Sequence, residues 1–178
     1  MKQRSKSYKI AIIGPESTGK SVLSEQLAKH FGGVFYPEIA RDYISSLARN
    51  YTINDIDAIL EMQKNQYFES INDTNPYQFF DTEWIITKIW YEWVYKVLPI
   101  NFSEVIDQLE YDFYLLCAPD IAWIPDSVRE NGGDARKQLF SVYEEELQFF
   151  NRPYGIVQGY GESRTQSAIL IVNEFIHR

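Results

Sequence analysis

Residues 14–21 read Gly-Pro-Glu-Ser-Thr-Gly-Lys-Ser and fit the phosphate-loop pattern G-x-x-x-x-G-K-[ST]. Glycines let such a loop wrap closely, so its backbone N–H groups and the N-terminus of the following helix point at phosphate oxygens. We expect Lys20 to reach the β- and γ-phosphates and the Ser21 hydroxyl to take one Mg²⁺ position. The pattern predicts a nucleoside triphosphate site, with contacts from Gly14, Pro15, Glu16, Ser17, Thr18, Gly19, Lys20, Ser21 and Val22.

A carboxylate follows an apolar segment farther along the chain, where Asp81-Thr82-Glu83 comes after residues 77–80. Phosphoryl transfer needs a held Mg²⁺, a positioned nucleophile and stabilised charge. Asp81 could hold Mg²⁺ with Ser21, or accept the proton of an attacking hydroxyl. Glu83 is a further candidate metal ligand. The alternative is that Asp81 only caps the helix that follows it.

Two arginines, Arg129 and Arg136, lie in or just after a polar stretch at 119–134 that contains Gly132-Gly133. Small-molecule kinases often close such a segment over ATP, and an arginine that reaches the transferring phosphate is worth about 10³–10⁵ in rate. We therefore expect an arginine-bearing lid, in which both arginines are catalytic. The alternative is an exposed helix whose arginines pair with neighbouring acidic side chains.

Glu38 and Arg41 follow the second apolar segment, where kinases of this kind hold the acceptor substrate. A surface ion pair at this i, i+3 spacing is the alternative, and it would contribute only a few tenths of a kcal/mol. The aromatic residues Trp84, Trp90, Tyr91 and Trp93 are expected to lie mostly in the core. Trp84 is the exception, because it lies nearest a strand end and could stack on a base or pyridine ring. Tyr160, between two glycines, lies where adenine often packs in such kinases, and an ordinary glycine turn is the alternative.

The elements that must position these residues alternate along the chain. Short apolar segments at 8–13, 34–36, 77–80, 111–117 and 155–157 predict strands, and the periodic segments between and after them predict helices. This alternation predicts an α/β fold with a five-stranded parallel sheet and helices on both faces. Such sheets bind ligands beyond the carboxyl ends of their strands, which is where every candidate above lies.

The composition restricts the number of domains and the kinds of partner that we expect. A chain of 178 residues with 45% apolar residues suits one domain, expected over residues 8–178 after a tail at 1–7. The net charge of −8 argues against binding to a nucleic-acid backbone. The single cysteine, Cys117, lies in an apolar run and is expected to fill the core. No segment approaches the roughly 18 apolar residues that span a bilayer, so we expect a cytoplasmic protein with no membrane partner.

These motifs together resemble the ribosylnicotinamide kinase domain of NadR-type proteins. The resemblance rests on the phosphate loop, on Glu38 with Arg41, on residues 80–83, and on residues 120–123 with Asp126, Arg129 and Arg136. It implies a P-loop kinase fold and transfer of the γ-phosphate of ATP to the 5′-hydroxyl of nicotinamide riboside. It also implies that Asp81 is the catalytic carboxylate near Mg²⁺, that Arg129 and Arg136 belong to the lid, and that Asp126 contacts the acceptor. The adenylyltransferase domain that often precedes such a kinase domain is not expected in these residues.

Two other functions stay open from the sequence. A kinase of the same fold could act on another nucleoside or on a nucleoside monophosphate, although a monophosphate would need more cations than Arg41 and Arg49. A regulator or ATPase could instead use ATP to switch a partner, and it would need no enclosed aromatic pocket.

Overall fold

The computed structural model describes residues 7–126 and 129–177. Five strands form one parallel sheet in the order β2-β3-β1-β4-β5. The strands are β1 (Tyr8–Ile13), β2 (Val34–Tyr36), β3 (Tyr77–Asp81), β4 (Phe113–Cys117) and β5 (Tyr154–Val157). The predicted α/β fold with a five-stranded parallel sheet is confirmed.

The register of the central strands positions the site. Ile12 of β1 pairs with Asp81 at the end of β3, and Ile13 pairs with Leu116 near the end of β4. The phosphate loop leaves the sheet directly after Ile13. The loop therefore begins beside Asp81.

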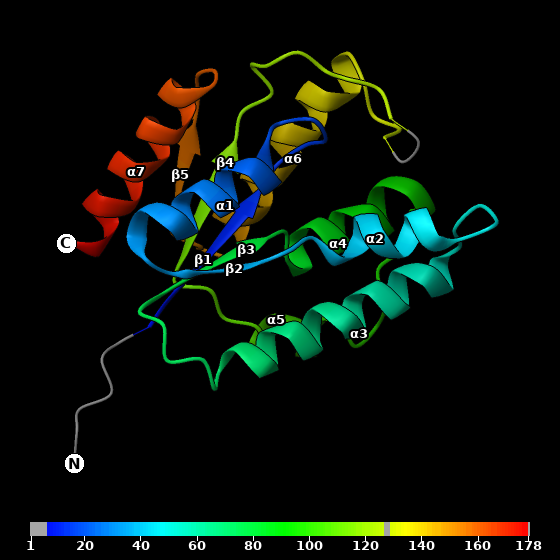
Figure 1. Cartoon of the computed structure of the whole chain (residues 1–178). Coiled ribbons are helices and arrows are strands. Elements are labelled where there is room, and N and C mark those ends of the chain that lie inside the picture. The colour runs from blue at the N-terminus through cyan, green and yellow to red at the C-terminus, as the bar shows by residue number, and fades with distance from the viewer. Residues whose placement is uncertain (1–6, 127–128, 178) are drawn as a thin grey trace.

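Helices cover both faces of the sheet, as Figure 1 shows. Helices α1 (Lys20–Phe31) and α7 (Glu162–Ile176) pack on the face that carries Ile10, Ile12 and Phe79. The other face packs against α3 (Ile53–Ser70), α4 (Trp84–Trp90), α5 (Phe102–Gln108) and α6 (Asp134–Phe149). The short helix α2 (Ile39–Ser46) follows β2. Alternate residues of β1 are buried on opposite faces, as the sheet geometry requires.

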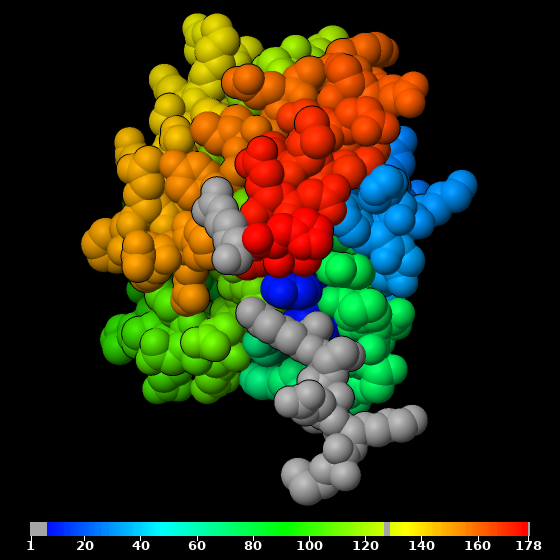
Figure 2. Space-filling model, turned by 90° about the vertical axis from the view of Figure 1, so that its left-hand side faces the viewer, coloured from blue at the N-terminus to red at the C-terminus, as the bar shows by residue number. Residues whose placement is uncertain are grey.

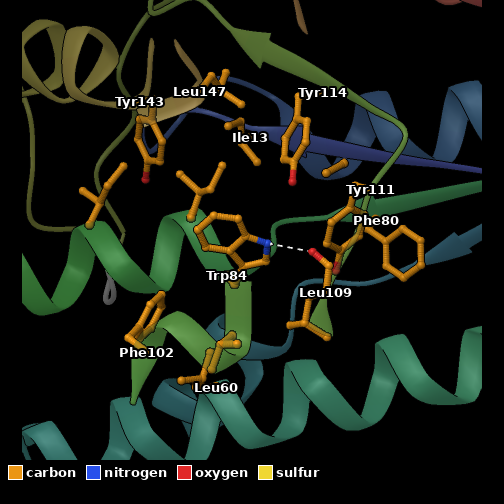
Figure 3. Packing of buried hydrophobic residues seen from close by; sticks show 14 of the residues in the cluster. Ile13, Leu60, Phe80, Trp84, Phe102, Leu109, Tyr111, Tyr114, Tyr143 and Leu147 are labelled. Carbon is orange, nitrogen blue, oxygen red and sulfur yellow. Dashed lines mark hydrogen bonds between the residues drawn. The ribbon is translucent and has the colours of Figure 1, made fainter. Parts of the chain in front are cut away.

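The core cluster on the face of the sheet that packs against α3, α4, α5 and α6 is rich in aromatic side chains, and Trp84 lies in its centre (Figure 3). Trp84 is 0% exposed, its indole Nε1 donates to the carbonyl of Leu109 at 3.2 Å, and its ring packs edge-on against Phe150. The prediction that Trp84 stacks on an acceptor ring is contradicted, because its ring is enclosed by core side chains. Cys117 is buried in the other cluster, as expected.

The aromatic segment after β3 is not one continuous α-helix in the structure. Helix α4 ends at Trp90, and a π-helical segment, η1 (Tyr91–Tyr95), continues it until Lys96, whose φ is 57°. A π-turn holds one more residue per turn than the α-helix, so it rotates the side chains that follow. This change of period decides where Trp93 points.

Figure 2 shows the side of the molecule on which β1 begins, with the end of α7 in red above the first residues of β1 in dark blue. The rings of Tyr8 and Phe175 meet there edge to face, with 6.0 Å between centroids. Of the expected tail at 1–7, only Ser7 is described; its hydroxyl donates to the carbonyl of Asn75, and residues 1–6 lie outside the described residues. None of the described helices combines the length and the apolar character needed to cross a bilayer.

Candidate active site

The phosphate loop is built by close backbone approach. Gly14 has a φ of 135°, and a Cβ at this position would lie 2.7 Å from the carbonyl oxygen of Cys117, so only glycine fits. Gly19 has a φ of 76° and is the N-cap of α1, so the first helical amides face the loop. The Lys20 ammonium lies inside the loop, where its Nζ donates to the carbonyls of Gly14 and Pro15 at 3.0 Å. A cation and a helix N-terminus thus meet where the sequence predicted a phosphate site.

Asp81 lies at the edge of this loop and is 1% exposed. Neither carboxylate oxygen has a hydrogen-bond partner among the described residues, although the Ser21 hydroxyl lies close enough to lower the pKa of the carboxyl. Burial raises the pKa of Asp81 to about 6, against the opposing effect of the Lys20 ammonium. Glu38 and Arg41 also act on this pKa, so they lie within electrostatic reach of Asp81.

Buried oxygens without partners next to a hydroxyl are what a hard cation would satisfy. The donor set of Asp81 and Ser21 fits Mg²⁺, because this ion usually takes one or two protein oxygens and completes its shell with water and substrate phosphates. No cluster of three or more His, Cys, Asp or Glu side chains placed to hold a metal occurs at 7–126 or 129–177. The fit of Mg²⁺ to this site therefore rests on two protein side chains, the Asp81 carboxylate and the Ser21 hydroxyl.

Glu83 does not join Asp81. Its side chain accepts a hydrogen bond from the Ile85 amide at 2.9 Å and so caps α4, and the residue is 0% exposed. Burial raises the pKa of Glu83 well above its ordinary value. The expectation that Glu83 is a metal ligand is contradicted, because its carboxyl faces the core as the cap of a helix. Helix capping, which was the alternative role for Asp81, is performed by Glu83.

Thr82, between the two carboxylates, has a φ of 73°, which is uncommon for a β-branched residue. Its amide donates to the Ile12 carbonyl at 3.1 Å, and the residue lines the cleft described below. The unusual backbone turns Asp81 and Glu83 into different surroundings. Strain of this kind is often stored at functional sites.

Arg136 lies in the first turn of α6 and is 5% exposed. All three of its nitrogens donate to backbone carbonyls: Nε to Glu16 at 3.0 Å, Nη1 to Ile121 at 2.8 Å and Nη2 to Ser17 at 2.8 Å. The expectation that Arg136 reaches the transferring phosphate is contradicted here, because the guanidinium is used to hold the loop. Arg136 instead joins the phosphate loop to the segment after β4.

Arg129 differs from Arg136 because it lines the cleft. Its Nε lies 3.1 Å from Asp126 Oδ2, and its Nη1 donates to the carbonyl of Ile124. Asp126 also accepts from Arg41 Nη1 at 2.9 Å, and Arg41 Nε lies 3.8 Å from Glu38 Oε2. These contacts form one chain of charges from the lid segment to α2, in which the Glu38–Arg41 pair was the alternative considered from the sequence. Ser127 and Val128, within the same predicted lid, lie outside the described residues.

A cleft opens from the phosphate loop between these elements, with about 890 Å³ of space that no atom fills, part of it solvent at the mouth. Aromatic and aliphatic side chains form its walls, and charged groups stand at its rim. The lining residues that the sequence analysis did not assign to a site are Ala40, Ile44, Tyr51, Thr82, Ile86, Ile89, Trp90, Trp93, Val94, Glu130, Asn131, Leu139 and Tyr143.

Two expected ATP contacts lie on the surface beyond this cleft. Tyr160 is 80% exposed in the loop between β5 and α7, and Val22 is 61% exposed on α1. The loop that holds Tyr160 is tied to the segment after β4, because the Gly159 amide donates to Asp120 Oδ2 at 2.7 Å and Arg164 pairs with Asp120 at 2.7 Å. Neither side chain lines the cleft, so any contact with ATP would be made outside it.

Comparison with known proteins places this site in a family. Residues 9–164 match a family model described as an AAA domain. The chain belongs to this family. The matched region contains the phosphate loop, Asp81 and the segment with Arg129 and Arg136.

Two curated relatives are the trifunctional NAD biosynthesis/regulator proteins NadR of Salmonella typhimurium and Escherichia coli. Each is 29% identical to this chain, over 139 and 138 residues, which is 74% of this chain and 33% of the relative. The chain therefore spans about a third of the length of these relatives.

Solved structures show the same fold. A NadR protein in complex with NR has a TM-score of 0.77 at 21% identity and covers 97% of this chain and 51% of that one. Deoxyadenosine kinase from M. mycoides with bound dCTP has a TM-score of 0.65 at 16% identity, covering 93% of this chain and 99% of its own. At these identities the likeness establishes the P-loop kinase fold.

Proposed function

We propose that the protein transfers the γ-phosphoryl group of ATP to the hydroxyl of a nucleoside-like acceptor, with nicotinamide riboside as the leading candidate. The observation that carries this proposal is the buried, unpartnered Asp81 beside a phosphate loop that opens into an aromatic cleft. A triphosphate switch would need the loop and a carboxylate that holds Mg²⁺, but no enclosed place for an acceptor. A kinase needs the carboxylate and an enclosed place for the acceptor as well.

The donor end of the site would hold ATP by its phosphates. The loop amides and Lys20 would neutralise the phosphate charge, and Ser21 with Asp81 would hold Mg²⁺. Bound there, Mg²⁺ supplies charge neutralisation at the phosphate oxygens. Lys20 reaches this position from the first turn of α1, where its ammonium already lies against the loop carbonyls of Gly14 and Pro15.

At the reacting end, the acceptor hydroxyl oxygen forms a bond to the γ-phosphorus while the bond from that phosphorus to the β–γ bridging oxygen breaks. ADP leaves with the electron pair of that bond, and the hydroxyl proton passes to a base. Asp81 fits the base because neither of its carboxylate oxygens has a partner among the described residues, so one can face Mg²⁺ while the other accepts the proton. Arg129 is the arginine placed to meet the transferring group, because it lines the cleft.

The walls of the cleft favour a flat ring. Trp90 and Trp93 are only partly buried and line the cleft together with Tyr51. Nicotinamide riboside carries a pyridinium ring, which is both flat and cationic, and aromatic faces attract such cations. Glu38 at the rim adds a negative charge on the same side. The similarity to NadR, seen with NR and with AMP-PNP in solved structures, supports this acceptor.

A deoxynucleoside acceptor is the second candidate, because deoxyadenosine kinase has the same fold. A thermal-shift screen of nicotinamide riboside, deoxyadenosine and thymidine monophosphate with AMP-PNP separates the two candidates. A ligand at 100 times its Kd stabilises the folded state by about 2.7 kcal/mol. We expect nicotinamide riboside to give the largest shift. A larger shift with deoxyadenosine would move the proposal to the second candidate.

A further inference from the structure

Glu16 is the one acidic residue of the phosphate loop, and its carboxylate points away from the loop. Its oxygens accept hydrogen bonds from the Glu130 amide at 3.0 Å, the Asn131 amide at 3.0 Å and Asn131 Nδ2 at 3.0 Å. An anion that accepts three N–H groups forms charge-assisted hydrogen bonds, which are stronger than neutral ones. Among the described residues, the Glu16 side chain attaches Glu130 and Asn131 to the phosphate loop, while Ser17 attaches the earlier part of the lid at Ala122 and Ile124.

The same two lid residues hold the opposite wall of the cleft. Glu130 Oε2 accepts from the Tyr51 hydroxyl at 2.8 Å, and Asn131 Oδ1 accepts from the Trp93 indole at 3.2 Å. Tyr51 precedes α3 and Trp93 lies in η1, so neither is a neighbour of the loop in the sequence. Glu16 thus orients two residues, and these in turn orient two rings of the acceptor wall.

We infer that Glu16 is a positioning residue that links the ATP loop to the acceptor wall through Glu130 and Asn131, so that ATP and the acceptor bind cooperatively. The inference rests on the proposed function, since it concerns the same cleft. Phosphates fix the loop and with it the Glu16 carboxylate. The fixed carboxylate keeps Glu130 and Asn131 in place, and the acceptor then meets rings that are already oriented.

Coupling of this kind is reciprocal for binding. If AMP-PNP raises the affinity for the acceptor by a given factor, the acceptor raises the affinity for AMP-PNP by the same factor. Arg136 does not supply this link, because it holds loop carbonyls and the carbonyl of Ile121, none of which contacts the acceptor wall. The connection to the rings passes through the Glu16 carboxylate.

The test compares wild type, Glu16→Gln, Glu16→Ala and the control Glu25→Ala, whose side chain is exposed on α1. The first arm follows hydrogen exchange of the amides of Glu130 and Asn131 in the protein without ligands. The second arm measures the Kd of nicotinamide riboside with and without AMP-PNP. Glu16→Gln keeps one acceptor oxygen and should give an intermediate result in both arms.

We expect exchange at Glu130 and Asn131 about tenfold faster in Glu16→Ala than in the control. We expect AMP-PNP to tighten acceptor binding about tenfold in wild type and less than about twofold in Glu16→Ala. Equal exchange in Glu16→Ala and the control would overturn the link, and unchanged coupling would overturn the positioning role. The exchange arm contains no nucleoside, so it decides the link whether or not nicotinamide riboside binds. If Glu16→Ala does not fold, Glu16→Gln against Glu25→Gln decides both arms.

Discussion

Replacing Asp81 by asparagine is expected to stabilise the ligand-free protein at neutral pH while it abolishes phosphoryl transfer. The native pKa of Asp81 is about 6, and its ordinary value is 3.8. Each pKa unit corresponds to 1.36 kcal/mol, so ionised Asp81 costs the folded state about 3 kcal/mol at neutral pH. Asparagine has nearly the same shape and carries no charge, so the variant avoids this cost.

The dependence on pH follows from proton binding. Between about pH 4 and pH 6 the native carboxyl keeps its proton while the unfolded one has lost it, so wild-type stability falls as the pH rises through this window. Asparagine does not titrate there. The variant should match wild type near pH 4 and exceed it by about 2–3 kcal/mol above pH 7.

Urea unfolding at a series of pH values, followed by tryptophan fluorescence, measures this difference. A variant that is less stable than wild type at neutral pH, or a difference that does not change with pH, would refute the reasoning about Asp81. In the same variant we expect kcat to fall by about 10²–10⁴ with AMP-PNP affinity retained. In wild type, kcat/KM should decline below about pH 6.

Four further substitutions separate the parts of the site. Trp93→Ala should raise the KM for the acceptor about tenfold or more and leave the KM for ATP unchanged, as steady-state kinetics would measure. Trp84→Ala should lower the free energy of unfolding by about 3–5 kcal/mol, as urea unfolding would measure. Arg136→Ala should lose about 2–3 kcal/mol of stability and weaken AMP-PNP binding in calorimetry, because three carbonyls lose their donor, and unchanged binding would return Arg136 to the lid hypothesis. Gly14→Ala should abolish AMP-PNP binding, since its Cβ would lie 2.7 Å from the Cys117 carbonyl oxygen; normal binding would show that the loop can shift.

The phosphate loop and the position of Asp81 could be predicted from the sequence because both depend on local signals. Residues 14–21 form a contiguous pattern, and Asp81 follows an apolar strand. A parallel sheet then brings the ends of β1 and β3 together whatever the details of packing.

The assignment of the aromatic residues could not be predicted in the same way. Trp84, Trp90 and Trp93 lie in one apolar helix, and a uniform α-helical period does not indicate the π-turn at η1. The structure reverses the expected roles: Trp84 packs in the core, while Trp90 and Trp93 line the cleft.

Charged residues pose a different difficulty, because the same groups serve several partners. The guanidinium of Arg136 can donate to a phosphate or to backbone carbonyls, and the carboxyl of Glu83 can bind a metal or cap a helix. Only the burial of each group and its surroundings decide between these roles, and both depend on the packing of segments far apart in the chain.

Transfer of label from [γ-³²P]ATP in the presence of Mg²⁺ tests the central claim most directly. Parallel reactions would contain nicotinamide riboside, deoxyadenosine, thymidine monophosphate or no acceptor, with Asp81→Asn as the control enzyme. We predict labelled nicotinamide mononucleotide, a kcat/KM for nicotinamide riboside that exceeds those of the other acceptors, and loss of the product with Asp81→Asn. Release of labelled phosphate at the same rate in every reaction, with no labelled nucleotide formed, would contradict a kinase and leave an ATPase.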